Sequence, residues 1–542
     1  MSKTVGRVGT LDVPATACET LDVLSEEIHK SCDCPVNMLQ VTALLEAGGI
    51  TDTIAQRRYG FTDVFALAEA VVTRLPQLSQ PVPGSNVLPV PEDPRWETVT
   101  DYLRGPMALL PMVLLSLIIM VYQGFGQWQI GQVLTLSMSM MGSLLVTSGF
   151  VQAASRKGSS YLSQGYVQAA SRTIGLVMAA ALLTVLITVA LFIVITLTLA
   201  WLPISDIILM AVAYVTLSCL WLAAPVLAML NQMHWFGIGL GIGAGLSYAG
   251  LQGLVHFGLP RGTVMLIATG LGLAGALGVM LLVIRHALAR EAATSTVSDH
   301  RVVLAPWPQL FVNLFPYFVY GVLYVLFILS GHVAGWVGVL PGGVERMQAF
   351  ATTEMGLTVA LGGYILASGV AERTMRRFWR RVKTYQLQTP QASSGSFSQI
   401  MHDFYLKERN HFVMILLLSS VFILTGVLVT IWITERAGMI VLPWTSATTT
   451  VLVLGLLGYG LMALGVFNCM FMITLSRPWQ AVSVIILGIL ATLGGGMGIS
   501  KLLPYQYSAT GMVIGGLVFI YATYLRLQNI LTHADYFYYA SF

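Results

Sequence analysis

The sequence predicts an all-α polytopic membrane protein, with about twelve transmembrane helices in two six-helix bundles behind a small soluble helical segment. Three observations support this fold class. The 542 residues are 56% hydrophobic and only 10% charged, whereas soluble domains carry about 25% charged residues. Apolar runs of about 20 residues, long enough to cross the hydrocarbon core, recur after residue 105. Basic residues gather on alternate loops.

The first 75 residues predict a soluble helical module on the cytosolic side. Helices are expected at 35–47, 51–59 and 63–75. Thr51 and Thr62 precede the second and third helices and are expected to cap them. Apolar residues at helical spacing give the third helix one apolar face, made of Val64, Leu67, Ala68, Val71 and Leu75.

Residues 76–104 predict a linker and an entry into the membrane. Six prolines between residues 76 and 94 indicate a stiff, extended connection. The segment from Trp96 to Arg104 is interpreted either as an amphipathic helix on the membrane surface or as ordinary linker.

Three of the five cysteines lie in the N-terminal segment, namely Cys18, Cys32 and Cys34. Their spacing, even with His29 as a fourth ligand, matches no zinc pattern well. We therefore expect reduced cytosolic thiols there. Cys219 and Cys469 lie in apolar runs and are expected to pack as small hydrophobic residues.

Twelve apolar runs are long enough to be transmembrane helices. A cytosolic linker at 291–308 divides them into a first bundle within 105–290 and a second within 309–530, and residues 531–542 form a C-terminal tail. The predicted spans are 106–125, 129–152, 173–201, 206–230, 235–257, 262–287, 309–335, 353–371, 411–433, 446–474, 479–500 and 507–527.

The loops differ in positive charge. From the loop after the second span onward, one set of loops together with the C-terminus holds sixteen Lys and Arg residues, and the other set holds four. Because cytosolic loops carry the excess of positive charge, both termini are predicted to be cytosolic, in a plasma (inner) membrane. A miscounted span would disrupt this alternation, so the asymmetry also supports twelve spans.

The two halves have similar plans. Each has its longest basic loop between its second and third spans, which suggests parallel repeats of the kind that several transporters use. The hexapeptide Val-Gln-Ala-Ala-Ser-Arg occurs at 151–156 and again at 167–172. It predicts a helix–turn–helix at the membrane face, with chance duplication of a small-residue helix end as the alternative.

Ionisable residues inside spans, which usually indicate function, are scarce. Four carboxylates fall at predicted span ends, namely Asp206, Glu354, Glu372 and Glu435. His256 and His332 lie near outer ends, where a solvated interfacial histidine is favoured over a proton relay. The candidate substrate pathway, for which helix–helix hydrogen bonding or core packing is the alternative, consists of Gln252, Asn313, Tyr317, Tyr320, Tyr324 and Asn468.

No motif indicates an enzyme. The sequence contains no HExxH, no Walker loop and no Gly-x-Ser-x-Gly in a strand–turn–helix setting. The outer loops lack the paired acids with which a membrane glycosyltransferase would hold a metal and activate an acceptor. We predict no catalytic residue, no cofactor and no metal site.

One stretch resembles a known superfamily. Ser148–Gly165, followed by Ala169–Arg172, is similar to the junction of the second and third helices in the multidrug, oligosaccharidyl-lipid and polysaccharide (MOP) exporter superfamily. The second half is similar to the Pel-type exopolysaccharide exporter subunit at Glu372–Arg381 and Ile400–Tyr405. The resemblance covers residues 105–530. The N-terminal module is extra, and the spans lack the buried arginines and acids of some members.

The resemblance implies an alternating-access exporter or flippase of a polysaccharide or lipid-linked saccharide. Membrane lipids, that substrate and a cytosolic or membrane glycosyltransferase are the candidate partners. Nucleic acid is not one, because the net charge is only +4 and scattered. A cytosolic basic face is expected to bind anionic headgroups or a synthase, or only to anchor the chain, and consists of Arg156, Lys157, Arg172, Arg373, Arg376, Arg377, Arg380, Arg381 and Lys383.

Two other functions fit the sequence. A major-facilitator transporter of small solutes shares the six-plus-six plan, but its loop between the second and third helices typically carries an aspartate, and residues 153–172 contain no acid. A non-transporting scaffold subunit of a polysaccharide synthase fits the sparse polar interior, with the N-terminal module as a docking piece.

Overall fold

The computed structural model describes residues 21–28, 38–78, 99, 101–107, 110–111, 130–163, 166–200, 202–255, 261–294, 307–338, 343–388, 394–436 and 444–532. The chain divides into two compact units. The first comprises Met1–Asp93 and Phe378–Phe397, and the second comprises Pro94–Arg377 and Ser398–Phe542. Every regular element in these described ranges is a helix, which confirms the predicted all-α fold.

The first unit contains the predicted helical module. Its helices are 21–28, α2 (Met38–Ala47), α3 (Asp52–Ile54), the π-helical η1 (Ala55–Tyr59) and α4 (Val64–Leu78). The helix at 21–28 was not predicted from the sequence. The module has one apolar core, which includes the described part of the predicted face of α4 and is made of Leu21, Leu24, Ile28, Val41, Leu45, Ala55, Tyr59, Val64, Leu67, Ala68 and Val71.

Two carboxylates organise the start of α4. The prediction that Thr62 caps this helix is wrong, because the Asp63 carboxylate accepts a hydrogen bond from the Ala66 amide at 2.7 Å. The Asp52 carboxylate accepts another from the Val64 amide at 3.0 Å. Both bonds satisfy amides that have no partner within the helix.

The second unit includes the helices of the first bundle, at the positions of the second to sixth predicted spans. Glycines bring α9 and α10 together, since a Cβ at Gly243 would lie 2.5 Å from the Gly272 carbonyl oxygen. The helices are α6 (Ile130–Ser163), α7 (Val167–Leu199), α8 (Ile204–Met229), α9 (Met233–Val255) and α10 (Arg261–Thr294).

The second bundle occupies the positions of the seventh to twelfth predicted spans. α12 and α13 are much longer than the spans predicted at 353–371 and 411–433, so both helices continue past the apolar segments. The helices are α11 (Trp307–Gly338), α12 (Gly343–Gln388), α13 (Ser394–Arg436), α14 (Ser446–Thr474), α15 (Pro478–Ser500), the 3₁₀-helix η4 (Tyr505–Ala509) and α16 (Thr510–Thr532).

The chain is a multi-pass membrane protein. Ten helices in its described part are long and apolar enough to cross a membrane. In addition to these ten, α9 lies at the span predicted at 235–257. Most of the span predicted at 106–125 lies outside the described residues. Apolar side chains such as Leu183 on α7 and Phe422 on α13 are 60% and 67% exposed, as expected where a helix faces lipid.

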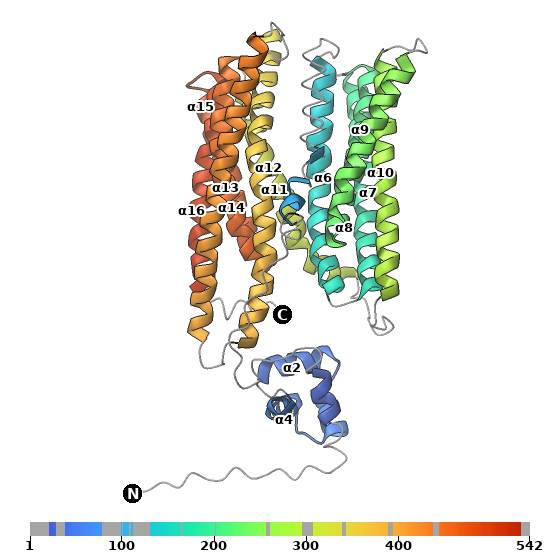
Figure 1. Cartoon of the computed structure of the whole chain (residues 1–542), viewed down its shortest axis with the longest axis vertical. Coiled ribbons are helices and arrows are strands. Elements are labelled where there is room, and N and C mark those ends of the chain that lie inside the picture. Colours follow the sequence, from blue (N-terminus) through green and yellow to red (C-terminus); the bar gives the residue numbers. More distant parts are fainter. Residues whose placement is uncertain are drawn as a thin grey trace. The chain divides into compact units, whose positions relative to one another are not determined.

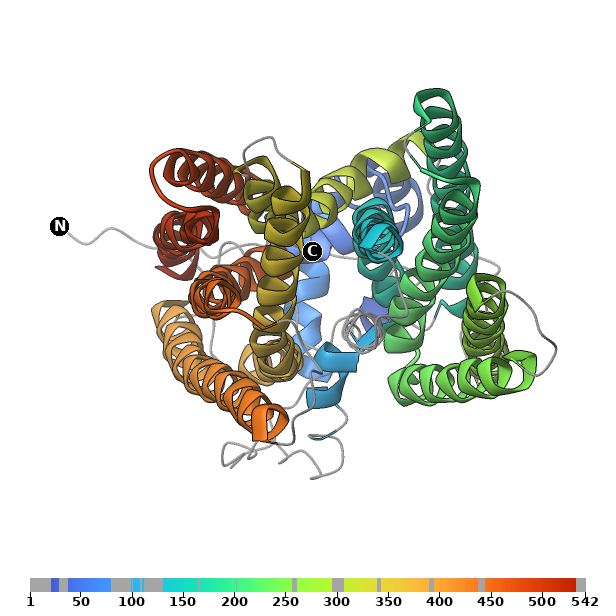
Figure 2. The same ribbon diagram turned by 90° about the horizontal axis from the view of Figure 1, so that it is seen from above.

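The bundles form two groups of helices. Figure 1 shows α6 to α10 on one side and α12 to α16 on the other, and Figure 2 shows the same division from above. α11 contacts both groups. Leu310 and Leu314, near its start, pack with Ala153 and Ala154 of α6. Farther along, the Phe327 ring lies against Phe519 of α16, with ring centroids 4.9 Å apart.

The contact between α6 and α11 is close because glycines line it. A Cβ at Gly321 would lie 2.5 Å from the Ser148 carbonyl oxygen, and one at Gly149 would lie 2.6 Å from the Phe318 ring. We call this contact the seam. It runs from the middle of both apolar spans toward the membrane face that carries the α6–α7 connection. We call this the α6–α7 face, and the charge distribution predicts it to be cytosolic.

Candidate functional site

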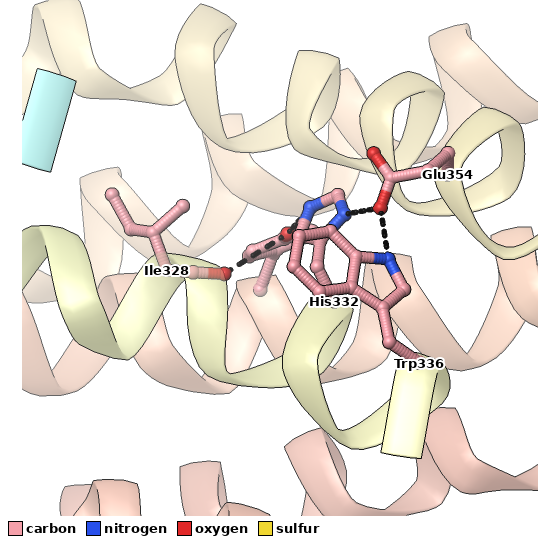
Figure 3. Close-up of polar contacts among 5 residues, drawn as sticks. Ile328, His332, Trp336 and Glu354 are labelled. Atoms are coloured by element: carbon pink, nitrogen blue, oxygen red, sulfur yellow. Dashed lines mark hydrogen bonds and ion pairs between the residues drawn. The ribbon is translucent and has the colours of Figure 1, made fainter. Parts of the chain in front are cut away.

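A buried polar network links three helices of the second bundle (Figure 3). His332 on α11 pairs through Nδ1 with Glu354 Oε1 on α12 at 2.8 Å. The other ring nitrogen, Nε2, lies 3.1 Å from the Tyr459 hydroxyl on α14. Trp336 Nε1 donates to the same Glu354 oxygen at 2.8 Å, and the Tyr459 hydroxyl donates to the Ile328 carbonyl oxygen at 3.3 Å.

The helices place these groups by simple periodicity. Ile328, His332 and Trp336 are four residues apart, so they lie on one face of α11. His332 is five residues inside the end of its apolar span and Glu354 is five residues inside the start of the next. At 1.5 Å per residue, both lie about 7 Å inside the spans, near the α11–α12 connection.

The network is shielded from solvent, which corrects the sequence interpretation. His332 is fully buried and Glu354 is 9% exposed, so the interpretation of His332 as a solvated interfacial residue is wrong. A charge removed from water requires a partner or a change of protonation. Here the two ionisable groups are each other's partner.

The network tolerates either protonation state of the imidazole. When His332 is positively charged, both ring nitrogens donate, to Glu354 and to the Tyr459 oxygen, and the tyrosine hydroxyl donates to Ile328. When His332 is neutral with its proton on Nδ1, Nε2 accepts from the Tyr459 hydroxyl. The two arrangements differ only by a rotation of that hydroxyl, and every buried group keeps a hydrogen-bond partner in both.

Hydroxyl groups lie beside this network. Thr353 precedes Glu354, and its methyl group lies against Gly335, which is next to Trp336. The hydroxyls of Thr353 and of Ser508 in η4 are buried and make no hydrogen bond within the described residues. Unpaired buried hydroxyls are costly, so they mark a polar side of the network.

The predicted tyrosine face of α11 forms a second cluster. The Tyr320 and Tyr324 rings are stacked, with centroids 6.2 Å apart and planes 11° apart. The Tyr324 hydroxyl is hydrogen-bonded to that of Tyr364 on α12. Tyr317 lies farther toward the α6–α7 face, where the Arg156 guanidinium stands 5.3 Å from its ring centroid. Tyr320 is buried, whereas the other two are half-buried.

The other predicted pathway residues are dispersed. Asn468 is buried within the second bundle, where its Oδ1 accepts from the Tyr405 hydroxyl at 2.9 Å and its Nδ2 donates to Thr523 Oγ1 at 3.2 Å. Asn313 and Gln252 are exposed and lie in different bundles. The structure thus groups Tyr320 and Tyr324 with Tyr364. Asn313 lies one turn before Tyr317 on α11, whereas Asn468 and Gln252 lie on other helices.

Several arginines of the predicted basic face have partners within the protein. Arg377 Nη1 donates to Glu408 Oε1 at 2.7 Å, and Arg376 pairs with Asp101. Arg156 on α6 donates to Oγ of Ser476, between α14 and α15, at 2.7 Å and so links the two bundles. These guanidinium groups connect elements that are distant in sequence.

The remaining members of the basic face have other surroundings. The Lys157 ammonium stands 4.7 Å from the Tyr161 ring centroid. Arg172 is exposed and lines a cavity of about 310 Å³ between the start of α7 and the end of α10. The side chains of Arg380, Arg381 and Lys383 lie outside the described residues, although their positions on α12 are helical.

No group of three or more candidate metal ligands occurs among the residues that the structure describes. Cys219 and Cys469 are free thiols, and Cys469 is buried as expected for a small packing residue. Cys18, Cys32 and Cys34 fall outside the described part of the chain.

Among the described residues, the fold is that of a membrane protein with two helical bundles that meet where α6 packs against α11. No protein-family model matches the chain, and no curated protein matches its sequence. Solved structures do match. One, described as MATE in the bent conformation, aligns with a TM-score of 0.54 and 14% identity over 84% of this chain and 99% of that one.

Two more structures extend this similarity. MATE in complex with MaL6 gives a TM-score of 0.52 and 13% identity over 84% of this chain and all of that one. The outward-facing conformation of a multidrug resistance MATE family transporter of the MOP superfamily gives a TM-score of 0.51 and 14% identity. That alignment covers 84% of this chain and 99% of that one. The chain therefore has the fold of MATE transporters, as the resemblance to MOP exporters implied. None of these matches is a Pel-type subunit.

Proposed function

We propose that the protein is an alternating-access exporter whose conformational cycle is coupled to protonation of the His332–Glu354 pair. The observation that carries this proposal is the burial of both residues inside adjacent membrane helices, hydrogen-bonded at 2.8 Å. An ionisable residue inside a membrane is costly to maintain and usually has a function. The MATE-like fold supplies the two bundles that alternating access requires.

The position of the network explains how a proton could bias the cycle. α11 carries His332 near one end, and the seam residues Leu314 and Gly321 lie near its start and at its middle. Pro316 lies within the helix, where it removes one backbone hydrogen bond and permits bending. A change in the link between α11 and α12 therefore reaches the contact between bundles through a single helix.

Protonation affects that link through electrostatics. In the charged pair, His332 and Glu354 attract one another in a medium of low dielectric constant. Adding a proton to the carboxylate or removing one from the imidazole abolishes this attraction. The two helices are then held by neutral hydrogen bonds alone, which are about half as strong. States of the transporter that separate α11 from α12 become more accessible.

A saccharide polymer or a lipid-linked saccharide is the proposed substrate. This part of the proposal rests on the sequence resemblance around Ser148–Gly165, because one of the similar solved structures is a multidrug resistance transporter and none is a saccharide exporter by its description. The cluster of Tyr317, Tyr320, Tyr324 and Tyr364 supports it, since aromatic faces and hydroxyls together suit sugar rings. The proposed location of the protein is the plasma membrane, with both termini on the cytosolic side.

The test is a strain that lacks the gene, complemented by the intact chain, with polysaccharide measured at the surface and inside the cell. Loss at the surface with accumulation inside, or on lipid carriers, is the expected result. Unchanged polysaccharide in both pools contradicts the saccharide proposal and favours a small-molecule substrate. Loss in both pools favours a scaffold on which the synthase depends.

A further inference from the structure

A helix that leads into the first predicted span packs against the second bundle. This entry helix, residues 101–107, lies against α12. The Tyr102 hydroxyl donates to the Leu366 carbonyl oxygen at 2.6 Å. A Cβ at Gly105 would lie 2.7 Å from the Gly369 nitrogen, and a Cβ at Gly369 would overlap the Tyr102 carbonyl oxygen. Glycine on each side therefore allows backbone contact.

Charged residues fix the other end of the entry helix. Asp101 is 5% exposed and pairs with Arg376 of α12. Arg104 lies one turn farther along the entry helix, with its Nε 3.9 Å from the same carboxylate oxygen. Since Asp101 is buried but the Arg376 side chain is 33% exposed, this pair orients the entry helix on α12 more than it adds to overall stability. The Asp101–Arg376 pair and the Gly105–Gly369 contact, one turn apart on the entry helix, both fit the same alignment of this helix on α12.

The same helix also contacts the first bundle. The Met107 side chain lies 3.6 Å from the position that a Cβ on Gly237 of α9 would take. The entry helix thus bridges α12 and α9, which belong to different bundles. Its contacts with α12 lie between Leu366 and Arg376, in the last part of the apolar span that ends at Phe378, so the bridge lies toward the α6–α7 face.

We infer that the entry helix is a clamp that ties α12 to α9 and holds the α6–α7 face closed. The seam and the bond from Arg156 to Ser476 close the same face. Opening this face requires the bundles to separate there, so the clamp must release α12 or α9. Its role in the transport cycle rests on the proposed function, whereas its mechanical role does not.

Substitution of Gly369 by alanine tests the clamp, because the added methyl group displaces Tyr102. In a chain whose five native cysteines are replaced, two single-cysteine reporters are compared by the rate of maleimide labelling in detergent. Ser368→Cys lies beneath the entry helix, where a Cβ on Gly105 would be 2.7 Å from Ser368 Oγ. Ala153→Cys lies in the seam and is 4% exposed.

We expect Gly369→Ala to raise the labelling rate of both reporters by about tenfold, which corresponds to about 1.4 kcal/mol in the free energy of opening. Gly426→Ala is the matched control, because a Cβ there meets nothing within 4 Å. Faster labelling at Ser368→Cys alone would show a docked helix that does not fasten the bundles, and would overturn the inference. No change at either reporter would overturn it as well.

A second set of variants shows whether the effect of Gly369→Ala is only a local packing defect. Asp101→Arg places a positive charge beside Arg376 and should therefore raise the labelling rate of both reporters. The double variant Asp101→Arg with Arg376→Asp should restore slow labelling, and failure to restore it would contradict the assigned pairing. These assays need neither substrate nor a proton gradient, so they distinguish failure of the clamp from failure of the proposed transport function.

Discussion

Glu354 and His332 form a hydrogen bond of 2.8 Å between α12 and α11, in a region where neither residue has more than 9% of its surface exposed. The pair is embedded in a hydrogen-bonded set in which every group keeps a partner whether the imidazole is neutral or charged. That property is what a proton-coupled conformational cycle needs, and it connects the chemistry of two residues to the relative positions of the helices.

The Tyr459 hydroxyl is the third member of the network, and its removal should be costly. Tyr459→Phe leaves His332 Nε2 without its partner at 3.1 Å. An unpaired buried polar group costs about 1–3 kcal/mol, so we expect a clear fall in the midpoint of thermal unfolding. Tyr521→Phe is the control, since Tyr521 is 66% exposed. Equal midpoints for the two variants would contradict the assigned network.

The seam should be sensitive to a single methyl group. Gly321→Ala places a Cβ 2.5 Å from the Ser148 carbonyl oxygen, and overpacking of this kind costs about 1–3 kcal/mol. Gly270→Ala in α10 meets nothing within 4 Å and should be neutral, or stabilising by about 0.5–1 kcal/mol. Thermal unfolding of both variants measures the difference. Similar values would show that α6 and α11 do not meet through these glycines.

Asp101 should give the clamp a dependence on pH. Burial raises the pKa of Asp101, and the positive charges of Arg376 and Arg373 offset part of that rise. The docked entry helix therefore binds a proton more readily than the undocked helix does. Its docking is strongest below the ordinary aspartate pKa and weakens as the pH rises through the raised pKa. Glu372 and Arg104 are the other ionisable groups nearby.

The measurement that checks this sign compares wild type with Asp101→Asn. The amide mimics the protonated acid, so we expect the variant to be at least as stable as wild type at pH 7. The difference in unfolding midpoint should shrink as the pH is lowered toward the raised pKa of Asp101. A variant that is less stable at pH 7 and matches wild type only at higher pH would contradict the direction.

The N-terminal module should depend on its own core. Leu67 is fully buried there, and replacing a buried leucine by alanine costs about 2–5 kcal/mol. In the full chain, Leu67→Ala should make the module much more susceptible to limited proteolysis. Phe65→Ala, at a neighbouring residue that is 47% exposed, should change susceptibility little. Equal digestion of the two variants would contradict the assigned core.

The positions of the helices could be predicted because span length and charge distribution are local properties. The apolar face of α4 follows from spacing alone, and its residues Val64, Leu67 and Val71 are all buried as predicted. The capping residue of α4 was harder to predict from the sequence, because Thr62 and Asp63 are both good capping residues. Only the backbone geometry selects the aspartate.

The site could not be predicted in the same way. His332 and Glu354 each lie five residues from a span end, where sequence alone favours a solvated residue. Their pairing depends on how α11 packs against α12 and on Tyr459, which lies more than a hundred residues away. The basic cluster on α12 was found by its composition, but its partners Asp101 and Glu408 come from other elements.

The most direct test of the account is complementation of the deletion strain by Glu354→Gln, with Glu435→Gln as control. Glu435 is exposed at the end of α13, so its variant should restore surface polysaccharide like wild type. At equal protein level in the membrane, Glu354→Gln should leave the surface depleted and polysaccharide accumulated inside. Full restoration of surface polysaccharide by Glu354→Gln would contradict proton coupling at this pair.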